Sequence, residues 1–347
     1  MKNRERNYDL LRSVCAVMVV VLHAAAFYQH SDISQYSNIG IFWQGVTRTA
    51  VPCFIMLSGA FLLSDERWKS YQFAIKKTIK VIMIPTLIYS IIFIGISFLT
   101  YYMGISDASY KEVLVLAAKG FPYPHMWYMF VCLGLYSITP LLWRLKMKVQ
   151  SFGEIKYIVF VIILLIIGSV VQSAGELFWM VRVPTLVGYF MIGDCIRRYY
   201  IDKESKPSGV ALLVWISVIL FSCFIQIYTL DWSFWDYSHT NPLNPLVIVA
   251  SISCFVFFSS INVKWDTYQF AKHTSRIYFV HIIPLQIIKV MMERFVGSLI
   301  VPIIGIPIMV LGAIVCSVIY SLIVNKIKHQ LNIRFKKMER KNMYEHS

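Results

Sequence analysis

An arginine and a histidine stand eleven residues apart in the otherwise apolar stretch RSVCAVMVVVLH, which runs from Arg12 to His23. In an α-helix, eleven residues complete about three turns, so both side chains leave the same face, about 16 Å apart along the axis. A histidine exchanges a proton near neutral pH, and burial keeps its ring neutral, as a general base must be. The spacing therefore predicts one helix stripe that joins a fixed cation to a titratable base. In the simpler interpretation, His23 only hydrogen-bonds a neighbouring helix.

Other ionisable side chains lie within or beside apolar stretches, where a charge at the centre of a membrane helix costs about 2.5–3.5 kcal/mol. Arg48 lies in the outer half of one such stretch, and Arg182 near the outer end of another, where the alternative is a side chain that extends to the interface. His125 lies beside aromatic residues, and His281 precedes Pro284, where a structural hydrogen bond is the simpler role. Each of these residues is a candidate because buried charges in membrane proteins face water, substrate or a partner.

The composition indicates which elements must hold these residues. Hydrophobic residues make up 58% of the 347 residues and charged residues 15%. A soluble domain has roughly 45–50% apolar and about 25% charged residues. The chain is therefore predicted to be an all-α, polytopic membrane helix bundle, because a membrane helix needs about 20 mostly apolar residues. Ten candidate spans follow, at residues 9–28, 42–63, 79–102, 125–144, 155–174, 180–199, 210–229, 243–261, 275–296 and 300–325.

The lysines and arginines predict the orientation of this bundle. Most of them fall in alternate connecting segments and in the basic tail 326–347, whereas the loops QHSDISQYSNIG and DWSFWDYSHTN contain none. Cytoplasmic loops carry such an excess, so both termini are predicted to be cytoplasmic. The net charge of +15 thus reflects topology and contact with anionic lipid, and we expect no nucleic-acid partner.

The seven cysteines and eight histidines give no sign of a metal or disulfide site. No CxxC, HxxxH or HExxH spacing occurs, and the cysteines lie mostly in apolar runs, as small buried hydrophobic residues do. The N-terminal apolar run lacks a convincing cleavage site and is expected to stay as the first helix.

Five motifs occur in order along nearly the whole chain. They are Arg12 and His23 in the first span, VPCFIMLSGAFLL, HMWYMFVCLGLYSITP, GYFMIGD and TSRIYFVHIIP. Together they resemble the acyltransferase-3 family of integral membrane acyltransferases, including its surface-polysaccharide O-acetyltransferases. The resemblance implies a single transmembrane domain over 1–347 in the bacterial plasma membrane. It also implies transfer of an acyl group, expected to be acetyl, from cytoplasmic acyl-CoA to a hydroxyl of a cell-surface glycan or lipid-linked sugar. The oligomeric state stays open.

The resemblance also implies where the donor binds. Arg12, Lys77 and Lys80 would hold the phosphates of acyl-CoA, with no metal required. The family's Arg-x-x-Arg pattern is replaced here by Lys77-Thr-Ile-Lys80, which keeps the charge but loses the bidentate fork. The sequence does not match the extracytoplasmic hydrolase-like domain that some members of the family carry, so we expect the membrane unit to act alone or with another protein.

Roles at the reacting centre follow from the same resemblance. His23 would take the proton of the acceptor hydroxyl and pass it to the leaving thiolate, and Arg48 would stabilise the tetrahedral oxyanion. Aromatic faces suit sugars, so the acceptor mouth is expected to contain His125, Trp127, Tyr128, Glu176 and Arg182.

Two alternatives belong to other classes. Buried arginine and histidine with prolines inside helices also suit a proton-coupled transporter or flippase of a lipid-linked or small polar substrate, although no inverted repeat is visible. A non-catalytic sensor that keeps the same fold would not need Arg12 and His23 on one stripe.

Overall fold

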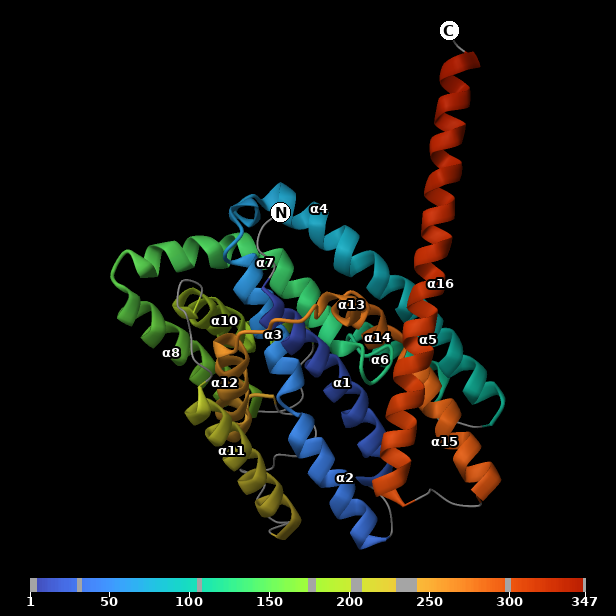
Figure 1. Ribbon diagram of the computed structural model, residues 1–347, viewed down its shortest axis with the longest axis horizontal. Helices are drawn as coiled ribbons and strands as arrows, with labels where there is room; N and C mark the ends of the chain where they lie inside the picture. The colour runs from blue at the N-terminus through green and yellow to red at the C-terminus, as the bar shows by residue number, and fades with distance from the viewer. Residues whose placement is uncertain are drawn as a thin grey trace. The chain divides into compact units, whose positions relative to one another are not determined.

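The computed structural model describes residues 5–29, 33–104, 108–173, 179–200, 208–228, 242–296 and 301–345. Helices fill most of these ranges and no strand occurs in them, which confirms the all-α prediction (Figure 1). The helices are α1 (Arg6–Gln29), α2 (Ser34–Thr47), α3 (Ala50–Leu62), η1 (Glu66–Lys69), α4 (Tyr71–Thr78), η2 (Ile79–Met83), α5 (Ile84–Tyr102), α6 (Tyr110–Ala118), α7 (Trp127–Gln150), α8 (Glu154–Ser173), α9 (Trp179–Thr185), α10 (Val187–Tyr200), α11 (Gly209–Tyr228), α12 (Pro245–Ser260), α13 (Tyr268–Ala271), α14 (Thr274–Val280), α15 (Ile282–Val296) and α16 (Pro302–Glu345).

Seven helical segments of the described chain are long and apolar enough to cross a membrane, and the bent pair α14–α15 raises the number to eight. Two of the ten predicted spans contain shorter helices, because α10 has 14 residues and α12 has 16. A helix of about 20 residues is needed to cross the hydrocarbon layer. The segments that pass are Arg6–Gln29, Ser34–Leu62, Tyr71–Tyr102, Trp127–Gln150, Glu154–Val171, Gly209–Tyr228 and Pro302–Gln330. The protein is therefore a multi-pass membrane protein.

Helix starts follow the local sequence. The Ser70 hydroxyl accepts a hydrogen bond from the Phe73 N–H at the start of α4. The Asn244 side chain accepts from the Leu246 N–H at the start of α12, where Pro245 takes the first helical position. Both arrangements satisfy N–H groups that no intrahelical carbonyl can reach.

The chain divides into two compact units. The first comprises Met1–Cys15 and Gly45–Asp266, and the second comprises Ala16–Gln44 and Thr267–Ser347. The first unit therefore contains α3 to α12, and the second contains α13 to α16 with most of α2. The helix α1 contributes its first turns to the first unit and its remainder to the second.

In the first unit, α3 and α10 pack at backbone contact. A Cβ atom added to Gly59 would lie 1.6 Å from the Phe190 carbonyl oxygen, and one added to Gly193 would lie 2.0 Å from the Met56 carbonyl oxygen. Small residues permit this approach in membrane bundles. The glycines of the SG and GYFMIG motifs therefore have a packing role, and they fix where the carboxyl ends of both helices lie.

In the second unit, α14 is joined to α16 by a polar cluster in which His273 and Ser321 are buried and Arg276 is partly buried. The Arg276 Nη1 atom donates to the Ser321 hydroxyl at 2.8 Å and to the Ser321 carbonyl at 3.1 Å. The same hydroxyl lies 2.7 Å from Nδ1 of His273. Because arginine only donates, the hydroxyl oxygen accepts from Arg276 and its proton is available to His273. The cluster anchors α14 and therefore the helix junction at its carboxyl end.

Candidate active site

The first motif lies on α1, which is unbroken from Arg6 to Gln29, so the helix predicted across Arg12 and His23 is confirmed. Arg12 donates from Nη1 to Asp9 Oδ1 at 3.0 Å, and its guanidinium lies 5.9 Å from the centre of the Phe61 ring. About 33% of the Arg12 side chain stays exposed. Arg197 lies 5.0 Å from the same ring and forms an ion pair with Glu5. Two arginines thus meet at Phe61, each with a carboxylate beside it.

His23 lies on the part of α1 that belongs to the second unit. Its side chain is half-buried. The centre of its ring lies 5.2 Å from the ring centre of His281, with 39° between the two ring planes. His281 is fully buried and stands between α14 and α15. The sequence singled out both histidines but did not predict that they meet.

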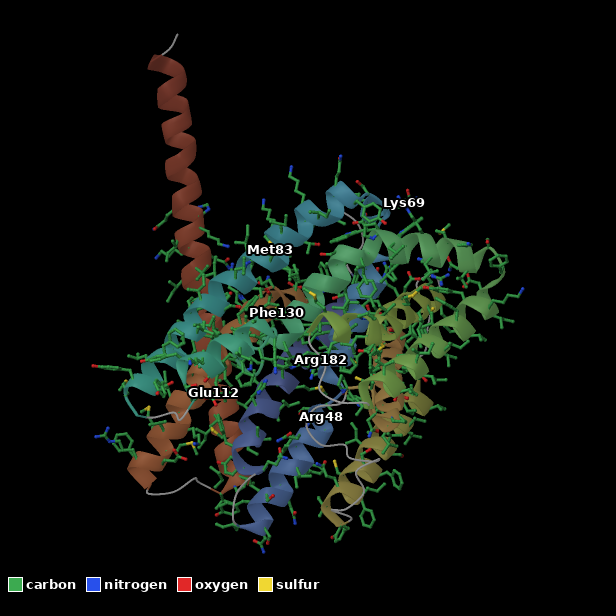
Figure 2. The ribbon with its side chains drawn as sticks, turned by 180° about the vertical axis from the view of Figure 1, so that it is seen from behind. Arg48, Lys69, Met83, Glu112, Phe130 and Arg182 are labelled. Carbon is green, nitrogen blue, oxygen red and sulfur yellow. The ribbon has the colours of Figure 1, made fainter. Side chains whose placement is uncertain are left out.

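Arg48 occupies a two-residue break between α2 and α3, within the segment Ser34–Leu62 that is long enough to cross the membrane. Its backbone N–H donates to the Gly45 carbonyl at 3.3 Å. The start of α3 carries the positive end of the helix dipole. The Arg48 guanidinium belongs to the residue two positions before that start, so both contribute positive potential at this break. Figure 2 marks Arg48 and Arg182, both in the first unit, well below Lys69 in that view.

Lys77 and Lys80 lie on α4 and on the single π-helical turn η2, and both are exposed. In the described part of the chain, neither lysine forms a hydrogen bond or ion pair, and no contact joins either of them to Arg12. Two further cations lie over aromatic rings where α4 and η1 meet α7. The Lys69 amine is 4.2 Å from the Trp143 ring centre, and the Arg144 guanidinium is 4.9 Å from that of Tyr71. Lys69 also forms an ion pair with Glu66 at 3.2 Å, so Arg144 is the one of these two cations that adds net positive charge beside the predicted lysines.

Arg182, on α9, is brought to the predicted acceptor residue Trp127. Its guanidinium lies 5.4 Å from the Trp127 ring centre and 5.1 Å from that of Phe121. The residue is only 7% exposed, so it does not extend to the surface as the alternative interpretation required. Cation–π contacts of this kind gain strength when they are desolvated. Glu176 lies outside the described residues.

His125 and Tyr128 are both buried beside aromatic rings in the same unit. The His125 ring meets Phe93 edge-on with centres 4.9 Å apart, and lies 5.8 Å from Tyr123. Tyr128 lies 6.1 Å from Phe54 of the second motif. The residues before and at the start of α7 thus form an aromatic region rather than a solvent-facing belt.

A buried charge network around Asp194 was not predicted. The Lys146 amine donates to Asp194 Oδ1 and to the Leu63 carbonyl, each at 2.8 Å. Arg198 donates from Nε to Asp194 Oδ2 at 3.0 Å, and the Ser64 hydroxyl donates to Oδ1 at 3.3 Å. The sequence did contain a signal for this network. Asp194 is the only acidic residue in the otherwise uncharged GYFMIGD motif, and a carboxylate in such a segment needs a partner when it is buried.

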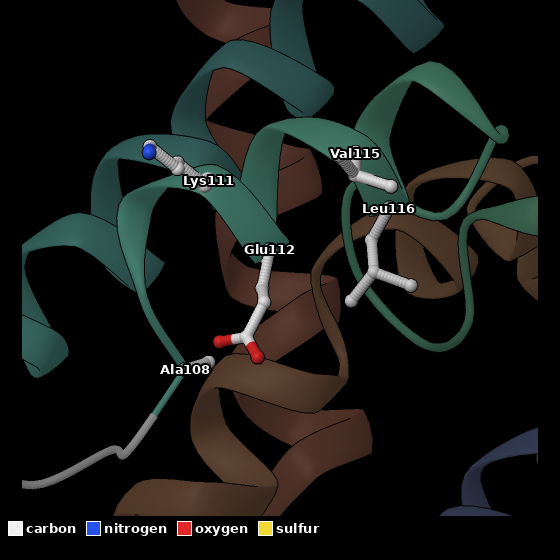
Figure 3. Close-up of a pocket in the computed structure, with 5 residues that line it drawn as sticks. All are labelled: Ala108, Lys111, Glu112, Val115 and Leu116. Atoms are coloured by element: carbon white, nitrogen blue, oxygen red, sulfur yellow. The ribbon is translucent and has the colours of Figure 1, made fainter.

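One hollow of about 570 Å³ lies along α6 in the first unit (Figure 3). Its walls contain none of the predicted site residues. The carboxylate of Glu112 accepts hydrogen bonds from the backbone N–H and the hydroxyl of Ser109, at 2.7 and 2.9 Å, so it already serves the start of α6. The lining residues are Ala108, Lys111, Glu112, Val115 and Leu116. Across the described ranges, no group of three or more His, Cys, Asp or Glu side chains is placed to hold a metal ion.

These features define a multi-pass helical membrane protein with histidine and arginine inside its units. The family model of the acyltransferase-3 family, described as an acyltransferase domain, matches residues 5–322. The chain therefore belongs to the acyltransferase-3 family and is a membrane acyltransferase. Searches of curated proteins and of solved structures find no match to it.

Proposed function

We propose that this acyltransferase moves an acetyl group from cytoplasmic acetyl-CoA to a hydroxyl of a cell-surface glycan or glycolipid in the bacterial plasma membrane. The observation that carries the proposal is the unbroken helix α1, which holds a partly exposed Arg12 and a half-buried His23 in a member of this family. An anionic donor suits the arginine, and a hydroxyl acceptor needs a base.

The chemical step balances with one histidine. His23 takes the proton of the acceptor hydroxyl as its oxygen bonds to the thioester carbonyl carbon. The tetrahedral oxyanion then collapses, the carbon–sulfur bond breaks, and the protonated ring gives its proton to the departing thiolate. Arg48, beside the positive end of α3, is the proposed partner of the oxyanion.

The binding roles rest on charge and shape. The exposed Lys77 and Lys80, with Arg12, suit the phosphates of acetyl-CoA. The half-buried Trp127 gives an aromatic face for a sugar ring, and Arg182 beside it gives a donor for sugar hydroxyls. The buried His125 and Tyr128 would shape the acceptor mouth. We assign Glu176 to the same acceptor site because it precedes α9 in sequence.

The direct test is to measure acetyl transfer by the purified protein in lipid nanodiscs. Two readouts are the release of free thiol from acetyl-CoA and the mass of the acetyl group added to surface glycans. His23→Ala should lower transfer by about 10²–10⁴-fold, the usual contribution of a general base, at unchanged protein level. His329→Ala is the matched control, because His329 is an exposed histidine on α16. Full activity in His23→Ala would remove His23 from the mechanism.

A transporter or flippase remains the second candidate, because two helix breaks, at Arg48 and at His281, lie next to ionisable groups. Transporters use interrupted helices in this way. A carrier would release no thiol from acetyl-CoA under any acceptor condition, so the same assay separates the two functions.

A further inference from the structure

We propose that His281 is a positioning residue for His23, which it holds in the orientation that proton transfer requires. This inference rests on the proposed function. His281 is not one of the residues assigned above to donor or acceptor binding, and its ring contacts His23 within the second unit.

His281 stands at a helix break that fixes its backbone. The α14 and α15 helices meet there at an angle of 50°. The His281 N–H donates to the Ile277 carbonyl at 3.0 Å, so the residue still belongs to the last turn of α14. Three residues further on, Pro284 has no N–H to offer the Val280 carbonyl, which explains why the helix does not continue straight.

The hydrogen bonds of the His281 ring fix its tautomer. Nδ1 lies 2.8 Å from the Tyr278 carbonyl and 3.0 Å from the Ile277 carbonyl. Carbonyl oxygens only accept, so Nδ1 carries the proton. In the neutral ring, Nε2 then carries the lone pair. The side chain is fully buried, so its ring is fixed in both orientation and protonation pattern.

A ring fixed in this way restricts its neighbour. The His23 ring centre lies 5.2 Å from that of His281, and the rings are tilted by 39°, so His23 cannot turn its ring freely in that direction. In serine and cysteine hydrolases, a third group holds the catalytic histidine in one orientation and one tautomer. His281 restrains the orientation of the His23 ring by packing against it, and its neutral ring adds no net charge to an apolar region.

His281 could instead serve only as a cap, because its Nδ1 bonds the last carbonyls of α14. Two substitutions at this position separate a capping role from a positioning role. His281→Asn keeps a donor near the place of Nδ1 and loses the far side of the ring, whereas His281→Gln keeps a polar group near Nε2 and loses the donor to the carbonyls. We expect His281→Asn to keep its thermal midpoint but to lose roughly 100-fold in kcat, the scale of loss from a misplacement of about 1 Å. The KM for acetyl-CoA should not change, and His281→Gln should be less stable yet keep more kcat per folded molecule.

If His281 serves only as a cap, activity will follow stability instead, and His281→Asn will be as active as the parent. That result would overturn the proposal. His273→Gln is the matched control, because it removes the Nδ1 atom through which a buried histidine of the same unit bonds Ser321. It should lower stability without changing kcat. The two failures are distinguishable. If the parent protein transfers no acetyl group, the proposed function fails and the His281 inference fails with it, whereas an active parent with a fully active His281→Asn variant overturns only the His281 inference.

Discussion

At the scale of single residues, the charge of Arg12 is shared between Asp9 and the solvent. The ion pair is 3.0 Å long, and Asp9 is almost fully buried whereas a third of the Arg12 side chain is exposed. A carboxylate beside a guanidinium offsets part of its attraction for phosphate. Arg12 alone is therefore a weak anchor for a donor that carries several phosphates, and the exposed lysines of α4 and η2 gain importance.

The first prediction concerns those lysines. The double variant Lys77→Ala/Lys80→Ala should raise the KM for acetyl-CoA roughly tenfold, since two phosphate contacts of about 0.7 kcal/mol each are lost at an exposed surface. Steady-state kinetics at low and high salt would measure it, and the difference from the parent should shrink as salt rises. Lys76→Ala, on the same exposed helix, is the control. An unchanged KM would exclude both lysines from donor binding.

At the scale of elements, Asp194 ties four helices together. Its carboxylate is fully buried and receives hydrogen bonds from α7, through Lys146, and from α10 itself, through Arg198. The Tyr157 hydroxyl of α8 lies 3.5 Å from Asp194 Oδ2. Lys146 also donates to the carbonyl of Leu63, the residue that follows α3. A network of this kind holds helix ends that apolar packing alone would leave free to slide.

The second prediction tests this network. Asp194→Leu leaves the buried Lys146 amine without its carboxylate and should cost about 3–5 kcal/mol. The double variant Lys146→Met/Asp194→Leu should recover part of the loss, because it removes both charges. Thermal midpoints in detergent, followed by size-exclusion chromatography, would measure the effect. Glu66→Gln, which breaks the exposed pair with Lys69, should change little.

The third prediction concerns α6 and pH. Ser109 and Glu112 form a reciprocal cap, and the hydrogen bonds from the Ser109 backbone N–H and hydroxyl lower the pKa of Glu112 below its ordinary value of 4.5. A lowered carboxyl pKa adds stability that is present above pH 4.5 and is lost as the pH falls through the folded pKa. Hydrogen exchange of the α6 amides, corrected for intrinsic rates, should accelerate as the pH falls below 4.5 and through the folded pKa of Glu112. In Glu112→Gln, which caps without titrating, this step should be absent.

Sequence patterns predicted most of the helices because long apolar runs need no partner to be recognised. The runs over α5, α8, α11 and α16 are of this kind. The break at Arg48 was not predicted, since an arginine near a proline marks a bend only once neighbouring helices are known. Pro284 already indicated a kink just after His281, but not that the helix breaks at His281 itself. The pairings Lys146–Asp194 and His23–His281 join residues far apart in sequence, and no local periodicity contains that information.

At the scale of the whole molecule, the distribution of lysine and arginine still predicts that both termini are cytoplasmic. The fourth prediction is that Lys111→Cys on α6 reacts with a membrane-impermeant thiol reagent added to intact cells. Lys76→Cys on α4 should react only after the cells are permeabilised. The parent protein, with its seven native cysteines, gives the background. The reverse pattern would invert the topology and place the proposed donor-binding lysines outside.

The glycine contacts between α3 and α10 have a mechanical consequence. With a carbonyl oxygen 1.6 Å from where a Gly59 Cβ would stand, no side chain separates the two backbones at that point. The pair is closed to water and solutes where these glycines lie. A conduction path through the first unit would have to avoid this contact, and a carrier mechanism that separated the two helices would have to break it.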